Sequence, residues 1–451
     1  MTAKLRQPGI FGQLCWDTYT LILLGFPDRQ GSSRDQVLST LDSAALRLLS
    51  AYPSLAGQVV NRGRTATNSG TYEIVPYPPH ENKSPVRRKD CSDLCPSYDE
   101  ILKADAPFFM LDGDILCPMK GMGYAYGPET EFPVFIVQAN FVKGGLLLCF
   151  ACMHNALDMN GQGTVLKMFA AAGRGDELDP TLLAAENLDA DSIVPLLKPG
   201  EASASHDVMR RPSTLTPSQT TAGPPRALPW NYWRFTGEGL AQLKKTASSG
   251  SEWVSTNDAL TAFLVQRLTA VRVAAGRVAP DEEVHLYRAV DSRSILKPPV
   301  PDGYLGHLVS LADTKWSTAQ DICESSFADL AVKVRKSLRE VDDHFVRSLA
   351  TLIKSTEDKS TIFYGAKAKP GRDFICSSWA QLHWLSNCDF GPGLGTVDFV
   401  RRARLPGVPD LTYIMPKNHK GDMHIAASTF MDDFVGLVND QQWREFAQLV
   451  G

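Results

Sequence analysis

Residues 34–52 carry apolar side chains every three to four positions, at 37, 41, 44, 45, 48 and 49. This spacing predicts an amphipathic helix, which Pro53 ends. Residues 132–141 and 146–153 form two β-rich runs, and the residues VKGG separate them. Because the second run is apolar almost throughout, the pair predicts a β-hairpin with a buried strand.

Strands and helices continue to alternate after this hairpin. Residues 164–173, TVLKMFAAAG, are typical of a helix with Gly173 as its stop. Between 174 and 230 the sequence is acidic, Ser-rich and Pro-rich, so we expect a crossover that buries little apolar surface. The second half predicts a strand at 233–235, helices at 237–248 and from about 255, a strand at 285–293, helices at 321–341 and 343–354, a hairpin at 411–416 and 423–430, and a final helix at 431–450.

The length of 451 residues exceeds the size at which a single hydrophobic core stops growing, so we expect two domains. The alternation of strands and helices in both halves indicates an α/β fold. We place an N-terminal domain at 1–200, a crossover linker at 201–229 and a C-terminal domain at 230–451.

The composition is that of an ordinary globular protein, with 43% apolar and 21% charged residues. A formal charge of −4 provides no basic field, which disfavours a nucleic-acid partner. No secretory signal opens the sequence, and no apolar run approaches the roughly 18 residues that indicate a membrane span. We therefore expect a cytoplasmic protein without a membrane partner.

The nine cysteines are scattered, as expected of reduced thiols. Cys149 and Cys152 spell CxxC, but no second pair or matching histidines accompany them, so we interpret them as small core residues. The sequence also lacks GxSxG, GxxxxGK[ST] and HExxH. GPGLG at 391–395 precedes TVDFVRRAR instead of a helix start, which disfavours a dinucleotide site.

The decapeptide HNALDMNGQG, residues 154–163, directly follows the buried strand. His154 therefore stands at a strand-to-loop junction, where side chains commonly face a cavity. Two interpretations of Asp158 are open: it orients the imidazole as in a catalytic triad, or it holds the turn by pairing with a buried arginine. Gly161 and Gly163 are expected to permit a sharp loop beside a ligand.

HNALDMNG fits the pattern HxxxDxxG, and NCDFGPGLGTVDFVRR, about 230 residues later, fits a DFGWG-type element. Together with YPSLAGQV, VSTNDALTAF, RAVDSR and SSWA, these motifs resemble the BAHD acyltransferases, most closely the fungal trichothecene 3-O-acetyltransferase branch. The resemblance covers most of the chain. Pro392 stands where the family usually has Trp, so packing that depends on this Trp is not carried over.

The resemblance implies two chloramphenicol-acetyltransferase-like α/β domains, each a mixed sheet with flanking helices, joined by a long crossover. A channel between them would admit acyl-CoA from one face and an alcohol from the other. His154 would be the general base and would return the proton to the leaving CoA sulfur, without an acyl-enzyme, a metal or a bound cofactor. The implied activity is CoA-dependent O-acyl transfer, most simply of acetyl, to a secondary-metabolite alcohol by a monomeric enzyme.

The resemblance also assigns structural roles around this base. Asp158 would brace the loop through Arg293 of RAVDSR, and Gly161 would belong to the same structural support. Asp389 and Gly391 of the DFG element would lie away from the reacting centre and shape the CoA side.

The serines of SSWA would face the pantetheine arm and the developing oxyanion. The helix start in VSTNDALTAF could receive a CoA phosphate, since helix N-termini favour anions. The adjacent arginines of FVRR are further phosphate candidates, with simple solvation as the alternative. The predicted CoA contacts are thus Ser255, Thr256, Ser377, Ser378, Arg401 and Arg402.

Two histidines are candidates for the acceptor side. His307 ends YLGH, where many relatives have Asn, and would affect acceptor choice if it lines the channel. His383 would project into the channel or lie on a strand face. Two functional alternatives are open: the same fold with His154 serving a cyclisation or isomerisation, and a catalytically silent binding protein.

Overall fold

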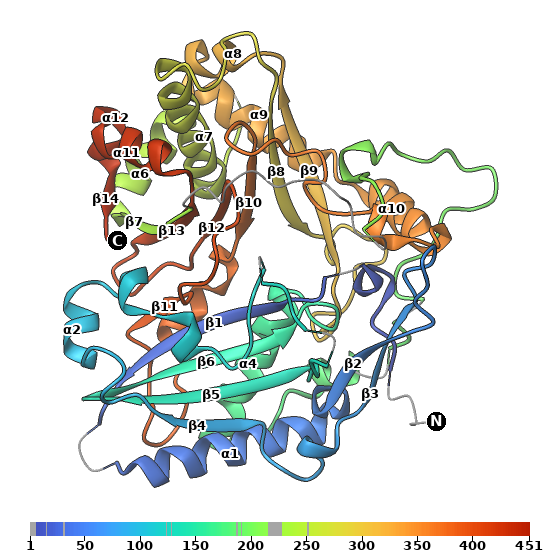
Figure 1. Cartoon of the computed structure of the whole chain (residues 1–451), viewed down its shortest axis with the longest axis vertical. Coiled ribbons are helices and arrows are strands. Elements are labelled where there is room, and N and C mark those ends of the chain that lie inside the picture. Colours follow the sequence, from blue (N-terminus) through green and yellow to red (C-terminus); the bar gives the residue numbers. More distant parts are fainter. Residues whose placement is uncertain are drawn as a thin grey trace.

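Two large β-sheets, one above the other in Figure 1, organise the chain, which is described here by a computed structural model. A separate two-stranded sheet pairs β2 (Gly57–Arg62) with β3 (Thr71–Pro76). The structure describes residues 6–14, 16–29, 32–122, 124–127, 129–185, 188–190, 192–214, 228–249 and 252–451.

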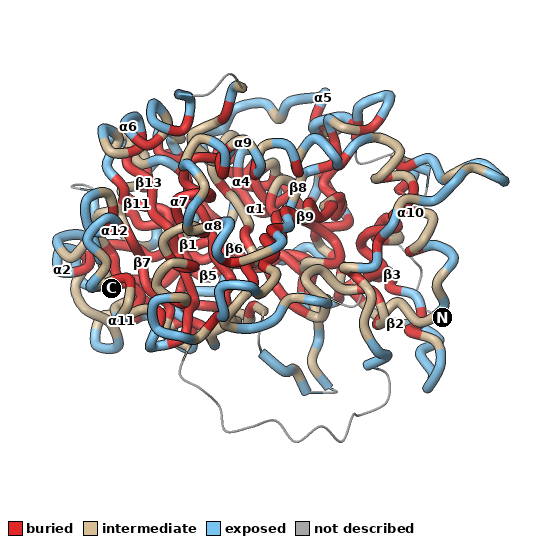
Figure 2. The backbone as a smooth tube through the Cα atoms, turned by 90° about the horizontal axis from the view of Figure 1, so that it is seen from above, coloured by how far each residue is buried: buried red, intermediate tan, exposed pale blue. Residues whose placement is uncertain are grey.

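The first sheet has five strands. In spatial order they are β11 (Phe399–Arg401), β1 (Tyr19–Pro27), β6 (Gly145–Met153), β5 (Phe135–Val142) and β4 (Val86–Asp90). The sheet is mixed, because β4 runs parallel to β5 and the other neighbours are antiparallel. Strands β5 and β6 form the predicted hairpin, and every residue of both is buried. They lie in the red interior of Figure 2.

The second sheet has seven strands. In spatial order they are β14 (Ala447–Leu449), β7 (Trp230–Phe235), β13 (Met423–Ser428), β12 (Leu411–Ile414), β10 (Phe374–Ser378), β8 (Val284–Asp291) and β9 (Val309–Trp316). This sheet is also mixed, since β10 is parallel to both β8 and β12. The predicted hairpin of β12 and β13 is confirmed.

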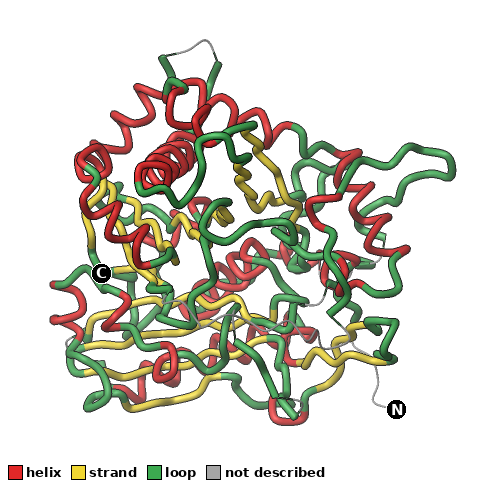
Figure 3. The backbone as a smooth tube through the Cα atoms, turned by 45° about the horizontal axis from the view of Figure 1, so that its top comes forward, coloured by secondary structure: helices red, strands yellow, loops and turns green. Residues whose placement is uncertain are grey.

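Helices flank both sheets, as Figure 3 shows in red. The N-terminal half contains α1 (Arg34–Ala51), α2 (Tyr98–Lys103), α3 (Gly113–Leu116), α4 (Met159–Arg174) and α5 (Pro180–Ala184). The C-terminal half contains α6 (Gly237–Ala247), α7 (Thr256–Ala274), α8 (Ala319–Glu324), α9 (Phe327–Arg339), α10 (Asp343–Ser355), α11 (Met431–Asn439) and α12 (Gln441–Phe446). Helix α1 packs against α4, and α7 packs against α6, α8, α9 and α11. The α/β fold with two mixed sheets is as the sequence predicts.

One strand of the first sheet comes from the C-terminal half of the chain. Strand β11 follows the DFG element and pairs with β1, so that Arg401 lies opposite Leu23. The predicted domain ranges remain a prediction. They do not include this pairing, in which a strand from the range predicted for the C-terminal domain joins the sheet of the N-terminal half.

The predicted linker is only partly within the described residues, because residues 215–227 lie outside them. Its described part, 201–214, is mostly exposed or half-buried, but two of its side chains are buried. His206 is buried and hydrogen bonds to Ser348 of α10 at 2.9 Å, and Met209 belongs to the hydrophobic core beside the same helix. Two large anchors therefore fix a segment whose composition alone predicts little burial.

Three predicted helices differ from the observed ones. The final helix is wrong as a single element, because Asp440 ends α11 and caps α12, and strand β14 follows α12. The helix predicted at 321–341 is divided into α8 and α9, and Ser326 caps the second. Helix α4 starts earlier than predicted and runs past Gly173 to a left-handed Gly175.

Candidate active site

His154 lies immediately after β6, in a turn held by hydrogen bonds to the Met153 carbonyl. Its backbone N–H donates to the carbonyl of Thr18 on the neighbouring segment, at 2.9 Å. The indole of Trp16 lies against the imidazole, with ring centroids 4.8 Å apart. The strand end, the turn and the indole together fix the orientation of the ring.

The ring of His154 has a defined tautomer. Its Nδ1 lies 3.1 Å from the Leu157 carbonyl oxygen, which can only accept, so Nδ1 carries the hydrogen. The other nitrogen, Nε2, has no hydrogen-bond partner among the described residues and is left with its lone pair. Burial lowers the pKa of His154 below its ordinary value of 6.5, more than the Leu157 carbonyl raises it. The imidazole is therefore neutral near pH 7.

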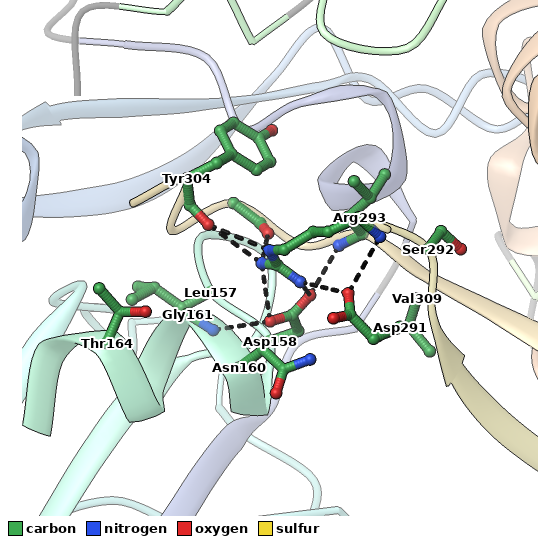
Figure 4. A network of polar contacts seen from close by, with 12 residues as sticks. Leu157, Asp158, Asn160, Gly161, Thr164, Asp291, Ser292, Arg293, Tyr304 and Val309 are labelled. Atoms are coloured by element: carbon green, nitrogen blue, oxygen red, sulfur yellow. Dashed lines mark hydrogen bonds and ion pairs between the residues drawn. The ribbon is translucent and has the colours of Figure 1, made fainter. Parts of the chain in front are cut away.

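The Asp158 carboxylate binds Arg293 (Figure 4), whereas Nδ1 of His154 is bound to the Leu157 carbonyl. The two carboxylate oxygens accept hydrogen bonds from the guanidinium at 2.9 and 3.0 Å. The backbone N–H groups of Gly161 and Leu308 donate to the same carboxylate at 2.9 and 2.8 Å. Asp158 thus caps α4 and joins it to the loop after β8. Asp158 therefore has the geometry of the second interpretation, in which it holds the turn by pairing with a buried arginine.

Gly161 and Gly163 do not form the predicted sharp loop, because both lie in the first turns of α4. They are small for packing reasons. A Cβ on Gly161 would lie 2.0 Å from the backbone oxygen of Leu305, and one on Gly163 would lie 2.6 Å from the side chain of Leu382. Each glycine therefore lets the helix approach a segment of the C-terminal half closely.

Two cavities lie next to each other, and His154 lines one of them. The first, called here the aromatic cavity, has a volume of about 380 Å³ and is lined by His154, Trp16, Trp379, Tyr413 and other residues. The second, the polar cavity, has about 830 Å³ and is lined by Asn160, Lys167, Asn257, Asp291 and others. Ala289 and Cys376 line both. The two cavities therefore share a wall close to the end of β10.

Ser377 and Ser378 end β10 at this shared wall. Ser377 lines the aromatic cavity, and Ser378 lines the polar cavity. The hydroxyl of Ser378 accepts a hydrogen bond of 3.3 Å from the Ala380 backbone, and none is found for the Ser377 hydroxyl within the described ranges. Successive strand residues point to opposite faces, which places one hydroxyl in each cavity.

Sequence reasoning missed several residues that line these cavities. Asn160, Thr164 and Lys167 of α4 line the polar cavity. Their spacing of four and three places them on one helix face, a signal that the sequence does contain. The aromatic rings that line the other cavity come from distant segments, and no local pattern connects them.

His307 lines the aromatic cavity, with 1% of its surface exposed. Its ring centroid lies 4.8 Å from that of His154. Neither ring nitrogen has a hydrogen-bond partner in the described part of the chain. Burial and the neighbouring His154 lower the pKa of His307 to about 3, so the ring is neutral. It contributes an uncharged aromatic wall beside the base.

His383 does not lie on a strand, nor does it line either cavity. It belongs to the 3-10 helix η8 (Ala380–Asn387) and is exposed. The helix turns its side chain outward while Leu382 and Leu385 are buried. The predicted acceptor-side position of His383 is therefore incompatible with this fold.

The DFG element is a tight turn packed on the end of α4. The Asp389 carboxylate accepts a hydrogen bond from the Gly391 backbone N–H at 2.8 Å. The backbone carbonyl of Asp389 accepts one from the Arg174 guanidinium at 2.5 Å. Gly391 has a φ of +98°, and a Cβ there would lie 2.3 Å from the Gly173 oxygen. Neither Asp389 nor Gly391 lines the two cavities.

The predicted phosphate contacts at the start of α7 are only partly available. Ser255 caps the helix, and both its hydroxyl and its backbone N–H donate to the Asp258 carboxylate, at 2.7 and 2.8 Å. Ser255 therefore has no donor left for a phosphate. Thr256 and Ser255 line neither cavity, whereas their neighbour Asn257 lines the polar one.

The two adjacent arginines have different surroundings, and neither is solvated. Arg401 is buried and binds Asp105 at 2.7 Å and the Ala106 carbonyl at 3.2 Å, so its donors are occupied. Arg402 is buried on the aromatic cavity. Neither arginine lines the polar cavity. A phosphate role in that cavity is thus not open to either.

Among the described residues, no helix combines the length and the apolar character needed to cross a membrane.

Comparison with known proteins gives consistent matches over the chain. Residues 18–173 match the domain family described as Trichothecene 3-O-acetyltransferase-like N-terminal domain, and residues 121–441 match the Transferase family. The O-acyltransferase pigD of Monascus ruber is 35% identical over 465 residues, covering 100% of both chains. The trichothecene 3-O-acetyltransferase TRI101 of Fusarium sporotrichioides is 32% identical over 445 residues, covering 96% of this chain and 95% of that one.

Solved structures agree with the fold. The F. sporotrichioides TRI101 structure, complexed with coenzyme A and T-2, has a TM-score of 0.90 at 31% identity and covers 99% of each chain. Vinorine synthase, at 17% identity and a TM-score of 0.67 over 96% of this chain and 92% of that one, shares the fold. Because the Transferase family match spans most of the chain and its relatives align end to end, the chain belongs to the Transferase family and is an acyltransferase.

Proposed function

We propose that this protein transfers an acyl group, most simply acetyl, from acyl-CoA to a hydroxyl of a secondary-metabolite alcohol, with His154 as the general base. The observation that carries the proposal is the His154 ring itself: neutral, with Nδ1 bound to Leu157 and Nε2 left with its lone pair at the wall of the aromatic cavity. A positioned base of this kind typically contributes a rate factor of about 10² to 10⁴.

In the proposed reaction both substrates are bound together. Nε2 takes the proton from the acceptor hydroxyl while the hydroxyl oxygen attacks the thioester carbonyl. The resulting tetrahedral oxyanion collapses, the carbon–sulfur bond breaks, and the CoA thiolate receives the proton from the imidazolium. Ser377 and Ser378, which line one cavity each, would donate to the oxyanion and to the pantetheine arm.

The two cavities suggest how the substrates divide. The polar cavity suits acyl-CoA, because it is the larger and Lys167 and Asn257 line it. The aromatic cavity suits a flat apolar acceptor, and His307 is proposed to form one of its walls. TRI101 crystals contain coenzyme A with T-2 or with deoxynivalenol, which supports a site for both substrates at once.

The test follows free thiol release from acetyl-CoA with a panel of hydroxylated metabolites. His154→Ala is expected to lower turnover by about 10² to 10⁴. Asp158→Asn is the matched comparison. If this variant is fully folded and equally inactive, Asp158 is part of the proton relay and the bracing role is wrong. Conversion of a metabolite without CoA would overturn the transferase proposal in favour of a cyclisation or isomerisation.

The predicted monomeric state and cytoplasmic location stay predictions. Size-exclusion chromatography with light scattering, and a fluorescent fusion in cells, would test them.

A further inference from the structure

Arg402 is a buried cation that lines the aromatic cavity, with 7% of its surface exposed. It follows β11, the strand that Figure 1 shows beside β1. Its guanidinium carbon lies 3.7 Å from the ring centroid of Tyr413, 5.2 Å from that of Trp379 and 5.7 Å from that of Trp230. Three aromatic rings therefore hold the side chain in place.

Arg402 differs from the other buried arginines in the described part of the chain. Arg272, Arg288, Arg293 and Arg401 each bind an aspartate within 3.1 Å. For the guanidinium of Arg402, no carboxylate or carbonyl partner is found among the described residues. The described residues that line its cavity include no Asp or Glu, so the cavity supplies no carboxylate counter-ion either.

A buried and unpaired charge is costly, because it loses its hydration without gaining a counter-ion. Aromatic faces recover only part of this cost, because a ring quadrupole attracts a cation more weakly than a counter-ion does. A ligand that supplies an anionic oxygen would satisfy the guanidinium, which binds planar oxygen anions at two points. The open face of Arg402 toward the cavity is where such an oxygen would be placed.

We propose that the acceptor of this enzyme is a planar hydroxylated compound with an acidic oxygen, either a carboxylate or an ionised enol or phenol, and that Arg402 binds this oxygen. This inference rests on the proposed function, because it places the reactive hydroxyl of the same compound at His154. The aromatic walls select a flat skeleton, and Arg402 selects its charged end.

Strand register limits where the two groups lie on the acceptor. Arg401 pairs with Leu23, so Arg402 lies at the level of residue 22, while the His154 N–H bonds to Thr18. Four strand residues correspond to roughly 13 Å along β1, and two strand spacings add roughly 10 Å across the sheet. The backbones that carry Arg402 and His154 are therefore about 16 Å apart, which favours an acceptor with its acidic oxygen and its reactive hydroxyl at opposite ends.

The experiment compares matched acids and esters on skeletons of increasing size: 4-hydroxybenzoic acid, 6-hydroxy-2-naphthoic acid and a hydroxyanthraquinone carboxylic acid, each against its methyl ester. Hydroxyanthraquinones without the carboxyl group but with an acidic phenol form the second arm, which distinguishes the two sources of the anion. Binding to the whole protein is measured by calorimetry without acyl-CoA, and kcat/KM is measured with acetyl-CoA.

The acid or acidic phenol of the skeleton that fits is expected to bind about 10- to 100-fold more tightly than its neutral partner, as for a hydrogen-bonded ion pair. Arg402→Met should reduce this preference to nearly one, and Arg402→Lys should keep part of it. Arg404→Met is the matched control, because this nearby arginine is exposed and pairs with Asp112. It should keep the wild-type preference.

Equal binding of charged and neutral partners by the wild type, or no binding by any acidic compound, overturns the inference without any variant. An unchanged preference in folded Arg402→Met also overturns it. The binding readout separates this inference from the proposed function: Arg402-dependent binding of an acid that is never acylated supports the site and contradicts the transfer reaction.

Discussion

Asp158 and Arg293 lie 135 residues apart in the chain and form a two-point ion pair at 2.9 and 3.0 Å. Both are buried, and the guanidinium also donates to the carbonyl of Gly306 at 2.7 Å. The pair connects the turn that carries His154 to the loop that carries His307. The position of the base relative to the C-terminal half therefore depends on an electrostatic contact as well as on apolar packing.

Asp158→Asn is expected to lower the free energy of unfolding by about 3 kcal/mol or more, because it leaves a buried guanidinium with one weaker partner. Denaturant unfolding, followed by tryptophan fluorescence, measures this change. Asp291→Asn is the control: Asp291 also binds Arg293, but its side chain is 37% exposed, so the loss should be smaller. Equal losses in the two variants would contradict the central position of Asp158.

Gly161→Ala is expected to destabilise the protein by about 1 to 3 kcal/mol, since its Cβ would meet the Leu305 backbone oxygen at 2.0 Å. Backbone of a packed segment moves less easily than a side chain, so the clash is costly. Gly237→Ala is the matched control, also in a first helical turn, with nothing nearer than 3.4 Å. The thermal midpoint should fall for the first variant only. A neutral Gly161→Ala would show that the two segments separate readily.

Local patterns in the sequence were sufficient for much of the fold. The cap of α7 is an example, because Ser255 and Asp258 are three residues apart and bind each other. The hairpin of β5 and β6 is another, since two apolar runs joined by a short connection are each other's nearest pairing partners along the chain. His154 could be singled out for the same reason: a polar group directly after a buried strand is visible in the sequence.

Long-range contacts are where sequence reasoning failed. Nothing near Arg402 indicates that Tyr413, Trp379 and Trp230 surround it, because each ring belongs to a different segment. Strand β11 joins the first sheet through a pairing with β1 that no period or motif reveals. The broken terminal helix is a different case, since Asp440 three residues before Trp443 is a helix-start signal that the continuous apolar pattern obscured.

The pH dependence of activity should have an acid limb with its midpoint below 6.5. The reaction needs the neutral imidazole, and burial lowers the pKa of His154, so protonation disables the base only at lower pH. kcat/KM should therefore be flat near pH 7 and fall as the pH decreases through the His154 pKa. A midpoint above 6.5 would contradict the environment described for this ring.

Unfolding must be excluded as the cause of that acid limb. Burial lowers the pKa of both His206 and His424 to about 4. The unfolded chain then binds more protons than the folded one between pH 6.5 and 4, and stability falls as the pH decreases through this window. Near-UV circular dichroism at each pH shows whether the enzyme is still folded where its activity is lost.

Arg401→Gln is expected to lower the free energy of unfolding by about 3 kcal/mol, with the KM for acyl-CoA unchanged. The substitution removes a buried guanidinium from the Asp105 carboxylate, which also binds His424 at 2.9 Å. Arg404→Gln is the control, because its pair with Asp112 is exposed and should contribute only about 0 to 1 kcal/mol. Urea titrations and acyl-CoA saturation curves of both variants measure the two effects. A raised KM in a stable Arg401→Gln enzyme would instead make Arg401 a CoA contact.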